Sequence, residues 1–473
     1  MVSKHINIIV RSMFYFLING QSAIANYLKI WHADHMSHAN QLELLQALEE
    51  EADLLERAAV PIVTVSATYK KELAKHYHLT YHTAADVVYS RAHYSMAEAV
   101  YQAALAGGHT SHLVDPTNFV SEENWKKIEF TQKVGRLMAR HKLLKWIKDQ
   151  IDTVVRSNLP ITKPITPPLR RLTKNVHRPI IAMHYEVGNL LVREGHQVIQ
   201  TLTDPHVRPQ YLDPLPSVKS KKTAHPHLKF SVFDEATQTA FFKTAVDLGK
   251  LVDPNQVVVT GPPIDPRIAK LAKRRKSLRS KRPVNLAVTT GGLGTNLSEI
   301  KQVLDDLRPL LLPPENIRLF LYGGIHRDFR DFFENFAAEN HVRIGNLDDP
   351  QARIRILYED SIIDANENLI KYMFPWADIV VTKPSGDMAY DAAAAGCGLL
   401  FLEPWGEWEQ NIQKVFVGLG VGFDLHVDTT LEHFKRLLTS GKLYESTKAA
   451  QTLPDLFRHG GAEIVKLQQN FNH

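Results

Sequence analysis

The sequence has little of what marks a secreted, membrane-spanning or nucleic-acid-binding protein. Its 473 residues include one cysteine, Cys397, so no disulfide can form within the chain, and we expect a cytoplasmic protein. The formal net charge of +5 is small, and we expect no nucleic-acid partner. The apolar segment 6–18 is interrupted by Arg11 and is shorter than the roughly 20 residues that cross a bilayer. It predicts a buried or interfacial helix.

The length and patterning of the chain predict more than one α/β domain. A chain this long seldom folds around one core. Leucines at helical spacing over residues 41–55 predict a helix, and after residue 80 short apolar segments alternate with helical patterns, as in parallel α/β sheets. Basic residues around 270–282 mark a boundary, and the proline-rich segment 160–179 predicts a surface loop. The expected division is a helical extension 1–80, an α/β domain 81–265, a basic linker 266–282 and an α/β domain 283–473.

Several segments are predicted as buried strands because they are short, apolar and followed by turn residues. In the first domain they are residues 84–89, 179–184 and 198–204, and in the second 284–289, 317–322, 379–382 and 399–402.

A glycine-rich turn follows the first strand of the second domain. Residues 289–296 read TTGGLGTN and stand between the predicted strand and a helix. Glycines there allow a phosphate to approach the backbone, and free amides at a helix N-terminus favour anions. Many such turns carry glycine for geometry alone, so the turn agrees with a phosphate site without requiring one.

A second segment, 383–396, follows the strand at 379–382 and reads KPSGDMAYDAAAAG. Asp391 falls one turn into its helix, where a carboxylate can accept two ribose hydroxyls, as in dinucleotide-binding folds. The alternative is an acidic residue favoured by the helix dipole.

Segment 383–396 resembles the pattern K-P-G-G-x-T-x-x-E-A-L-A-x-G of the monogalactosyldiacylglycerol synthases and the N-acetylglucosaminyltransferase that makes lipid II, glycosyltransferase family 28. Residues 406–411, GEWEQN, are similar to the family's G-Q-E-E-x-N. Residues 257–264 resemble the strand that ends the family's N-terminal domain. Residues 89–99 resemble its G-G-G-H-x-x-x-A-E-A at His93 and the following A-E-A, but Arg91 and Ala92 replace glycines.

The resemblance implies a GT-B fold, in which two Rossmann-like domains face each other across a cleft. It further implies a UDP-sugar donor in the C-terminal domain and a lipid or polyprenyl-linked acceptor in the N-terminal one. Backbone groups near Ile363 would contact uracil, Asp391 would bind the ribose, and residues 407–411 the sugar. The donor-binding residues expected on this basis are Gly291, Gly292, Gly294, Thr295, Ile363, Lys383, Ser385, Gly386, Asp391, Glu407, Trp408 and Asn411.

The same resemblance suggests inverting transfer of a hexose or N-acetylhexosamine, with His93 as general base and His184 and Asp204 at neighbouring strand ends. Imidazole titrates near neutrality, which suits proton removal from an acceptor hydroxyl. Helix dipoles and the glycine turn would stabilise the leaving UDP, so we expect no metal and no other cofactor. Two alternatives stay open. One is a nucleotide-sugar epimerase, which can use the same fold. The other is a non-catalytic nucleotide-sugar-binding scaffold, which the missing glycines and the substitutions at Ser385 and Asp387 favour.

Residues 136–148 combine five basic side chains with leucines and a tryptophan. This pattern is typical of a helix at the headgroup level of an anionic membrane, or of a basic helix packed on the sheet. With the resemblance it predicts peripheral contact with the inner face of the cell membrane.

Overall fold

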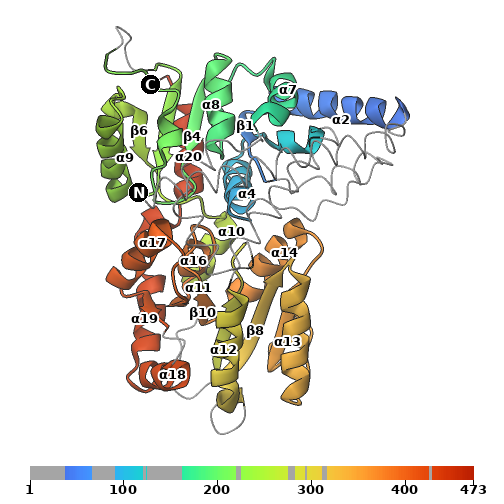
Figure 1. Cartoon of the computed structure of the whole chain (residues 1–473), viewed down its shortest axis with the longest axis vertical. Coiled ribbons are helices and arrows are strands. Elements are labelled where there is room, and N and C mark those ends of the chain that lie inside the picture. The colour runs from blue at the N-terminus through green and yellow to red at the C-terminus, as the bar shows by residue number, and fades with distance from the viewer. Residues whose placement is uncertain are drawn as a thin grey trace, which may run out of the picture.

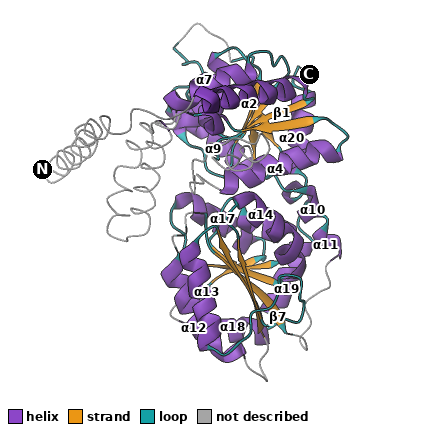
Figure 2. Cartoon of the chain, turned by 90° about the vertical axis from the view of Figure 1, so that its right-hand side faces the viewer, coloured by secondary structure: helices purple, strands orange, loops and turns teal. Residues whose placement is uncertain are grey.

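The computed structural model describes residues 38–66, 91–120, 124, 162–219, 225–274, 283–292, 294, 296–311, 317–425 and 429–472. Two α/β units follow one another along the long axis of the molecule (Figure 1). Each has a six-stranded sheet whose neighbouring strands all run parallel, with helices beside it (Figure 2). The predicted fold class, two Rossmann-like domains, is confirmed.

The strands are short runs of apolar residues because helices bury a parallel sheet on both faces. In β1, for example, all four residues of the sequence VPIV are buried. The N-terminal sheet has the order β2-β1-β3-β4-β5-β6. Its strands are β1 (Val60–Val63), β2 (Ser111–Val114), β3 (Ile180–Ala182), β4 (Val198–Thr201), β5 (Leu228–Val232) and β6 (Val257–Val259).

The C-terminal sheet has the order β12-β11-β10-β7-β8-β9. The predicted strands at 284–289, 317–322, 379–382 and 399–402 all lie in it, shifted by at most two residues at their ends. The strands are β7 (Val284–Thr289), β8 (Ile317–Gly324), β9 (Ile354–Tyr358), β10 (Ile379–Thr382), β11 (Gly398–Phe401) and β12 (Gly422–Asp424).

Capping residues fix where several helices begin and end. Asp234 accepts a hydrogen bond from the Thr237 amide at the start of α9, and Gly396, at φ +83°, follows the last turn of α16. In the N-terminal half the α-helices are α2 (His38–Arg57), α4 (Arg91–Ala106), α7 (Thr162–Thr173), α8 (Tyr185–Arg193), α9 (Glu235–Asp247), α10 (Pro266–Ala269) and α11 (Leu271–Arg274).

In the C-terminal half the α-helices are α12 (Leu297–Leu307), α13 (Arg327–Glu339), α14 (Ile362–Asn368), α15 (Phe374–Trp376), α16 (Met388–Ala394), α17 (Glu407–Gly418), α18 (Thr430–Thr439), α19 (Lys442–Gln451) and α20 (Gly460–Gln469). Short 3₁₀ turns are η1 (Pro116–Phe119), η2 (Pro209–Leu212), η3 (Pro254–Gln256), η4 (Arg308–Leu311) and η7 (Asp455–Phe457), and η5 (Leu369–Met373) is a π-helical turn.

The domain boundaries predicted from the sequence need three corrections. Of the predicted helical extension 1–80, the described residues 38–66 belong to the N-terminal unit, because β1 pairs with both β2 and β3 inside its sheet. Segment 160–179 is not a loop, because it contains α7, which packs against α2. The C-terminal domain does not keep the whole chain after 283, because α20 returns to the N-terminal unit (Figure 1). The predicted strand 84–89 and the basic segment 136–148 lie outside the described residues.

Helix α20 is fixed to the N-terminal unit by side-chain hydrogen bonds. The amide of Gln468 donates to the carbonyl oxygens of Ala59 at 3.2 Å and Pro179 at 3.0 Å. The turn before α20 passes so close to the inter-domain segment that a side chain at Gly261 would come within 2.1 Å of the Leu456 carbonyl oxygen. The end of the chain thus connects the two units a second time.

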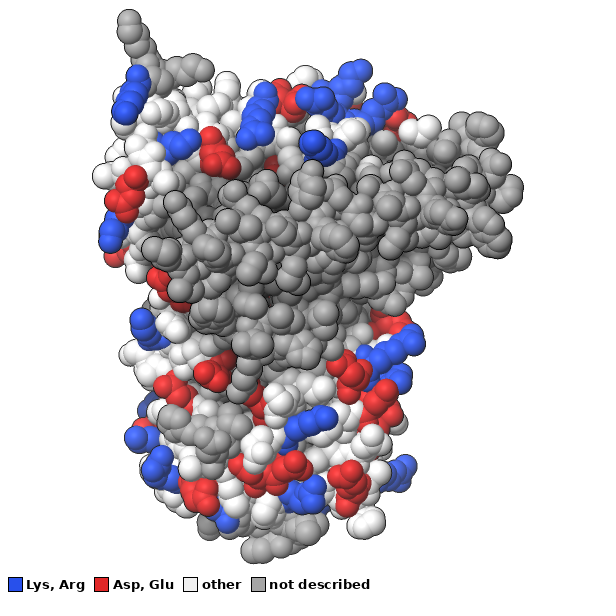
Figure 3. Space-filling view, viewed as in Figure 1, with Lys and Arg blue, Asp and Glu red and all other residues white. Residues whose placement is uncertain are grey.

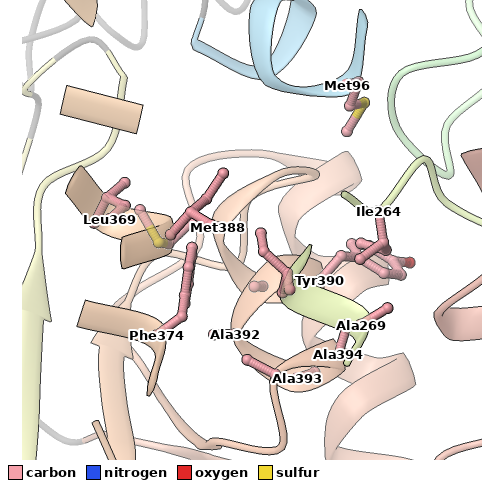
Figure 4. Close-up of a cluster of buried hydrophobic side chains, with 14 of the residues drawn as sticks. Met96, Ile264, Ala269, Leu369, Phe374, Met388, Tyr390, Ala392, Ala393 and Ala394 are labelled. Carbon is pink, nitrogen blue, oxygen red and sulfur yellow. The ribbon is translucent and has the colours of Figure 1, made fainter. Parts of the chain in front are cut away.

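One hydrophobic cluster runs through the junction of the two units. It includes Met96 of α4, Ile264 of the connecting segment, and Met388 and Tyr390 of α16 (Figure 4). Large apolar interfaces restrict relative domain motion, so this cluster holds the two sheets in a defined relation. It also buries α16, the helix that carries the predicted ribose-binding residue.

The described surface of the C-terminal unit carries Lys and Arg interspersed with Asp and Glu on the face in Figure 3. In the described part of the chain, every helix is too short or too polar to cross a membrane.

Candidate donor and catalytic site

The order of the strands predicts where a ligand would bind in each sheet. In an open parallel sheet, the crevice lies at the carboxyl ends of two adjacent strands whose connections run to opposite sides. In the C-terminal sheet this point lies between β7 and β10, and in the N-terminal sheet between β1 and β3. The glycine turn follows β7, segment 383–387 follows β10, and His184 follows β3. The residues predicted as functional therefore stand at the two crevices.

The C-terminal crevice contains a cluster of buried charges that reaches across the domain boundary. Arg91, at the start of α4, is 3% exposed. Its Nη1 donates to Oδ2 of Asp387 at 2.7 Å, and its Nη2 donates to Oδ1 of Asn366 at 2.9 Å and to Oδ2 of Asp391 at 3.2 Å. The predicted ribose-binding carboxylate is thus paired with an arginine from the N-terminal unit.

Burial and pairing perturb the pKa values in this cluster. Burial opposes the charge of Arg91, but Asp387, Tyr322 and Asp391 together raise its pKa above the usual value. Burial raises the pKa of Asp391 to about 7, although Arg91 pulls it down. Burial would also raise the pKa of Asp387, but Arg91 and hydrogen bonds from Ser385 and Met388 lower the pKa of that carboxyl below its usual value of 3.8. Near neutral pH the cluster therefore holds one firm ion pair, Arg91–Asp387, and a carboxyl that can lose or gain a proton.

A small cavity lies against this cluster. It has a volume of about 20 Å³, which is room for a water molecule and not for a nucleotide sugar. A side chain at Gly292 would lie only 3.7 Å from the backbone nitrogen of Arg91, so the glycine turn of one unit closely faces the first helix of the other. A ligand the size of a nucleotide sugar could occupy this place only after the facing segments moved apart. The cavity is lined by Arg91, Thr290, Gly291, Gly292, Tyr322, Gly324, Ile325, His326, Ile362, Ser385, Asp387 and Met388.

Lys383 and Glu409 form a second buried ion pair on the C-terminal side. The Nζ of Lys383 lies 3.3 Å from Oε2 of Glu409 and 5.7 Å from the centre of the Trp405 ring. Glu409 also accepts a hydrogen bond from the backbone amide of Trp405. Glu407, predicted as a sugar contact, is exposed at the start of α17. The carboxylate that joins Lys383 is therefore Glu409, two residues further along.

The three predicted catalytic residues come together on the N-terminal side. The rings of His93 and His184 meet edge to face with their centres 4.9 Å apart. Asp204 lies close enough to His93 to oppose the fall of its pKa, and Oδ2 of Asp204 accepts a hydrogen bond from Arg208 at 3.0 Å. His184 also caps α8, since its Nδ1 accepts a hydrogen bond from the Glu186 amide. Residues from three separate segments thus form one cluster.

Both histidines are neutral at physiological pH. Burial lowers the pKa of His93 to about 4, although Asp204 acts in the opposite direction. Burial, together with His93 and Arg208, lowers the pKa of His184 well below 6.5. A neutral imidazole can accept a proton, and Nδ1 of His93 is buried with no hydrogen-bond partner among the described residues. The chemistry available here is proton removal, with Asp204 placed to stabilise the cation that results.

The two clusters adjoin across the cleft. A side chain at Gly386 would come within 2.8 Å of the Thr203 carbonyl oxygen and 3.4 Å of the Asp204 side chain. The guanidinium of Arg208 lies 5.7 Å from the centre of the Trp408 ring. The segment that follows β10 therefore meets the strand end that carries Asp204.

Comparison with models of protein families and with curated proteins gives no match for the sequence. Among solved structures, MurG from Acinetobacter baumannii is 13% identical with a TM-score of 0.43, over 86% of this chain and 98% of that one. Spinosyn rhamnosyltransferase SpnG is 11% identical, with a TM-score of 0.46 over 86% and 99%.

A third similar structure is the UDP-GlcNAc 2-epimerase from Neisseria meningitidis, solved with UDP-GlcNAc bound. It is 11% identical, with a TM-score of 0.43 over 69% of this chain and 89% of that one. Scores this low carry no argument about chemistry, so the assignment of the site rests on its own residues.

The remaining predicted donor residues are placed as follows. Ser385 lies at the cavity, and its Oγ accepts a hydrogen bond from the Met388 amide. The amide of Ile363 already donates to Ser361 Oγ at 3.2 Å, so its contact with a base stays a prediction. Gly294 has φ +59°, which suits glycine, and Asn411 is half-buried on α17. Thr295 lies outside the described residues, and no group of side chains within the described ranges could hold a metal ion.

Sequence reasoning missed several residues of the site. Arg91 was noted only as a lost glycine, although a buried cation in place of glycine is itself a signal. Asp387 stood inside the recognised segment 383–396, and Asn366 close to the predicted uracil position, but neither was chosen. Arg208 stands four residues after the predicted Asp204, and Glu409 lies inside the recognised segment 406–411, but its partner Lys383 is on a different element, so only the fold shows the pair.

Proposed function

We propose that the protein is a glycosyltransferase that moves a hexose or N-acetylhexosamine from a UDP-sugar to a hydroxyl group, with inversion at the anomeric carbon. The observation that carries this proposal is the meeting of two crevices. His93, His184 and Asp204 stand at the N-terminal one and directly face segment 383–387 of the C-terminal one. A proton acceptor opposite a nucleotide-binding crevice is the arrangement that glycosyl transfer needs.

The proposed reaction is a single displacement. His93 takes the proton of the acceptor hydroxyl while that oxygen attacks the anomeric carbon of the donor. The bond between the anomeric carbon and the UDP oxygen breaks, and UDP leaves with the bonding electrons. Asp204 favours the imidazolium that forms, against the opposing effects of burial and of Arg208 on the pKa of His93.

Asp391 would bind the ribose hydroxyls of the donor, and Lys383 with Glu409 and Trp408 would border the sugar. The resemblance of segments 383–396 and 406–411 to family 28 supports uridine as the nucleoside. It also supports a lipid or polyprenyl-linked acceptor, reached by peripheral contact with the inner face of the membrane. The basic segment 136–148 that would make this contact lies outside the described residues.

A thermal-shift screen of nucleotide sugars tests the donor, because a ligand that binds only the folded protein raises its melting temperature. We expect UDP-hexoses or UDP-N-acetylhexosamines to stabilise the protein more than the corresponding ADP- and GDP-sugars do. Transfer to a short polyprenyl phosphate or diphosphate sugar, or to diacylglycerol, is then followed by UDP release. Stabilisation by UDP-sugars without any turnover would favour the non-catalytic scaffold instead.

The pairing of the two histidine rings favours one second candidate, a nucleotide-sugar epimerase. His93 and His184 meet edge to face, as a paired acid and base would, and an enzyme that handles a single substrate needs no acceptor groove. Epimerisation removes a proton from a sugar carbon and returns one. It would therefore place solvent deuterium on that carbon, which NMR detects, whereas displacement at the anomeric carbon leaves the carbon-bound hydrogens of the sugar unexchanged.

A further inference from the structure

Arg91 occupies a position that neither half of the proposed mechanism explains. It belongs to α4 of the N-terminal unit, two residues before His93, yet its guanidinium lies in the donor crevice of the C-terminal unit. There it is bound to the same carboxylate, Asp391, that the donor ribose would use. The guanidinium of Arg91 therefore holds a carboxylate that the ribose of the donor would also use.

The hydrogen bonds of Arg91 are incomplete. Its two terminal nitrogens are bound to Asp387, Asn366 and Asp391, and the Tyr322 hydroxyl also interacts with the guanidinium, whereas Nε is buried and has no hydrogen-bond partner among the described residues. An unpaired, buried N–H of a charged group is costly and points to an acceptor that arrives with a ligand. Arg91 also lines the cavity beside Gly291 and Gly292, which precede the N-terminus of α12.

Two of the groups that line this cavity, the guanidinium of Arg91 and the glycine turn, can bind an anion with several oxygen atoms. A guanidinium binds phosphate through a planar fork of N–H donors, and a helix N-terminus after a glycine turn favours the same charge. The hydrogen bond from Arg91 to Asp387 is 2.7 Å long, and the one to Asp391 is 3.2 Å long. We therefore expect Arg91 to keep Asp387 and to release Asp391 when a ligand binds. Ribose hydroxyls that bind Asp391 would release Nη2 of the arginine toward the phosphates.

We propose that Arg91 is a donor-binding residue that exchanges Asp391 for the diphosphate of the nucleotide sugar when the donor enters. This rests on the proposed function and deepens it. The guanidinium of the N-terminal unit then touches the leaving group held by the C-terminal unit, and closure of the cleft brings this cation to the donor. Where the family pattern has glycine, this chain has a side chain that neutralises the departing UDP.

Calorimetric titration of the full-length protein with three probes tests the exchange: UDP, uridine and inorganic pyrophosphate. In Arg91→Met we expect the affinity for UDP and for pyrophosphate to fall at least tenfold. The affinity for uridine should stay the same or rise, because Asp391 loses its competitor. If UDP and uridine affinities change by the same factor, or if pyrophosphate affinity is unchanged, Arg91 does not bind the diphosphate.

Two further variants make the result specific. Arg267→Met breaks the pairing of Arg267 with Asp265 and Glu367 outside the cavity, and it should leave all three affinities as in the wild type. Arg91→Lys keeps the positive charge that the two aspartates need, so it serves if Arg91→Met does not fold. Lysine lacks the planar fork of N–H donors, so Arg91→Lys should still weaken pyrophosphate binding several-fold without weakening uridine binding. An unchanged affinity for pyrophosphate would overturn the proposal.

The probes also separate this inference from the proposed function. Binding of pyrophosphate that depends on Arg91, without any binding of uridine, would leave the arginine site standing and refute the choice of a UDP-sugar. Binding of UDP that is equally tight in the wild type and in Arg91→Met would refute the role of Arg91 and leave the choice of a UDP-sugar standing. A wild-type protein that binds none of the three probes would overturn both.

Discussion

The site residues on the two sides of the cleft are encoded differently in the sequence. On the C-terminal side, strand, turn and helix follow one another within segment 379–396, so a local motif fixes where Lys383 and Asp391 lie. On the N-terminal side, His93, His184 and Asp204 stand on three separate segments, and only the order of the strands brings them together. The resemblance named these three residues from the sequence, but only the structure shows how closely they approach one another.

The two sides also differ in charge. The C-terminal side carries buried ion pairs, and one partner, Arg91, comes from the opposite unit. The N-terminal side offers two histidines with lowered pKa values beside the ion pair of Asp204 with Arg208. This difference fits a division of labour in which one side binds an anionic donor and the other removes a proton.

Loss of the proposed base should give the largest effect. We expect His93→Gln to lower kcat by about 10²–10⁴, the usual contribution of a general base, while UDP affinity stays unchanged. Steady-state kinetics and calorimetry measure the two quantities. His112→Gln, which breaks a contact with Glu51 away from the cleft, is the control. Loss of UDP binding in His93→Gln would remove the distinction between the two sides.

The second connection between the units can be broken at Gly261. Its φ is +87°, and an alanine there would also overlap the Leu456 carbonyl oxygen, so Gly261→Ala should lower the free energy of unfolding by about 3 kcal/mol. Gly195→Ala is a matched control with φ +90° and open space around it, and it should cost only about 1 kcal/mol. Denaturant melts compare them; equal losses would mean that the close approach of the segment before α20 is unimportant.

The donor side is tested by Asp391→Asn. Because a charged acceptor of hydrogen bonds is removed, we expect affinity for uridine and UDP to fall about ten- to a hundredfold. Glu432→Gln, an acidic residue in the first turn of α18, controls for the helix dipole and should leave binding intact. If Asp391→Asn binds uridine as tightly as the wild type, the carboxylate stabilises α16 or pairs with Arg91 and does not bind the ribose.

The smallest expected effect is a dependence on pH. Burial raises the pKa of Asp391 from 3.8 to about 7, so the folded protein holds this proton more tightly than the unfolded chain. The resulting stability is complete below pH 3.8 and is lost as the pH rises through 7. The melting temperature of Asp391→Asn minus that of the wild type should therefore increase from pH 4 to pH 7. Fluorimetric melts across this range test it, and a constant difference would show that the pKa of Asp391 is not raised.

Much of the C-terminal sheet could be predicted because its strands are short, mainly apolar runs that turn residues or helical patterns follow. Strand β1 was missed because VPIV follows a long leucine-patterned helix and contains a proline, which disfavours strand assignment. Helix α7 was missed because Pro167 and Pro168 lie within it. In both cases the free energy gained by burying the segment in the N-terminal unit outweighs its local conformational preference. A short window of sequence carries no information on that burial.

The sequence by itself determined the α/β class, most strands of the C-terminal sheet and the turns that follow them, because apolar runs and turn residues act over short distances. Only the tertiary structure decided that α20 returns to the N-terminal unit, that β1 lies inside the sheet, and that Arg91 reaches Asp387 and Asp391. These contacts join residues far apart in the sequence, and the longest of them form because the two units meet around a shared apolar cluster.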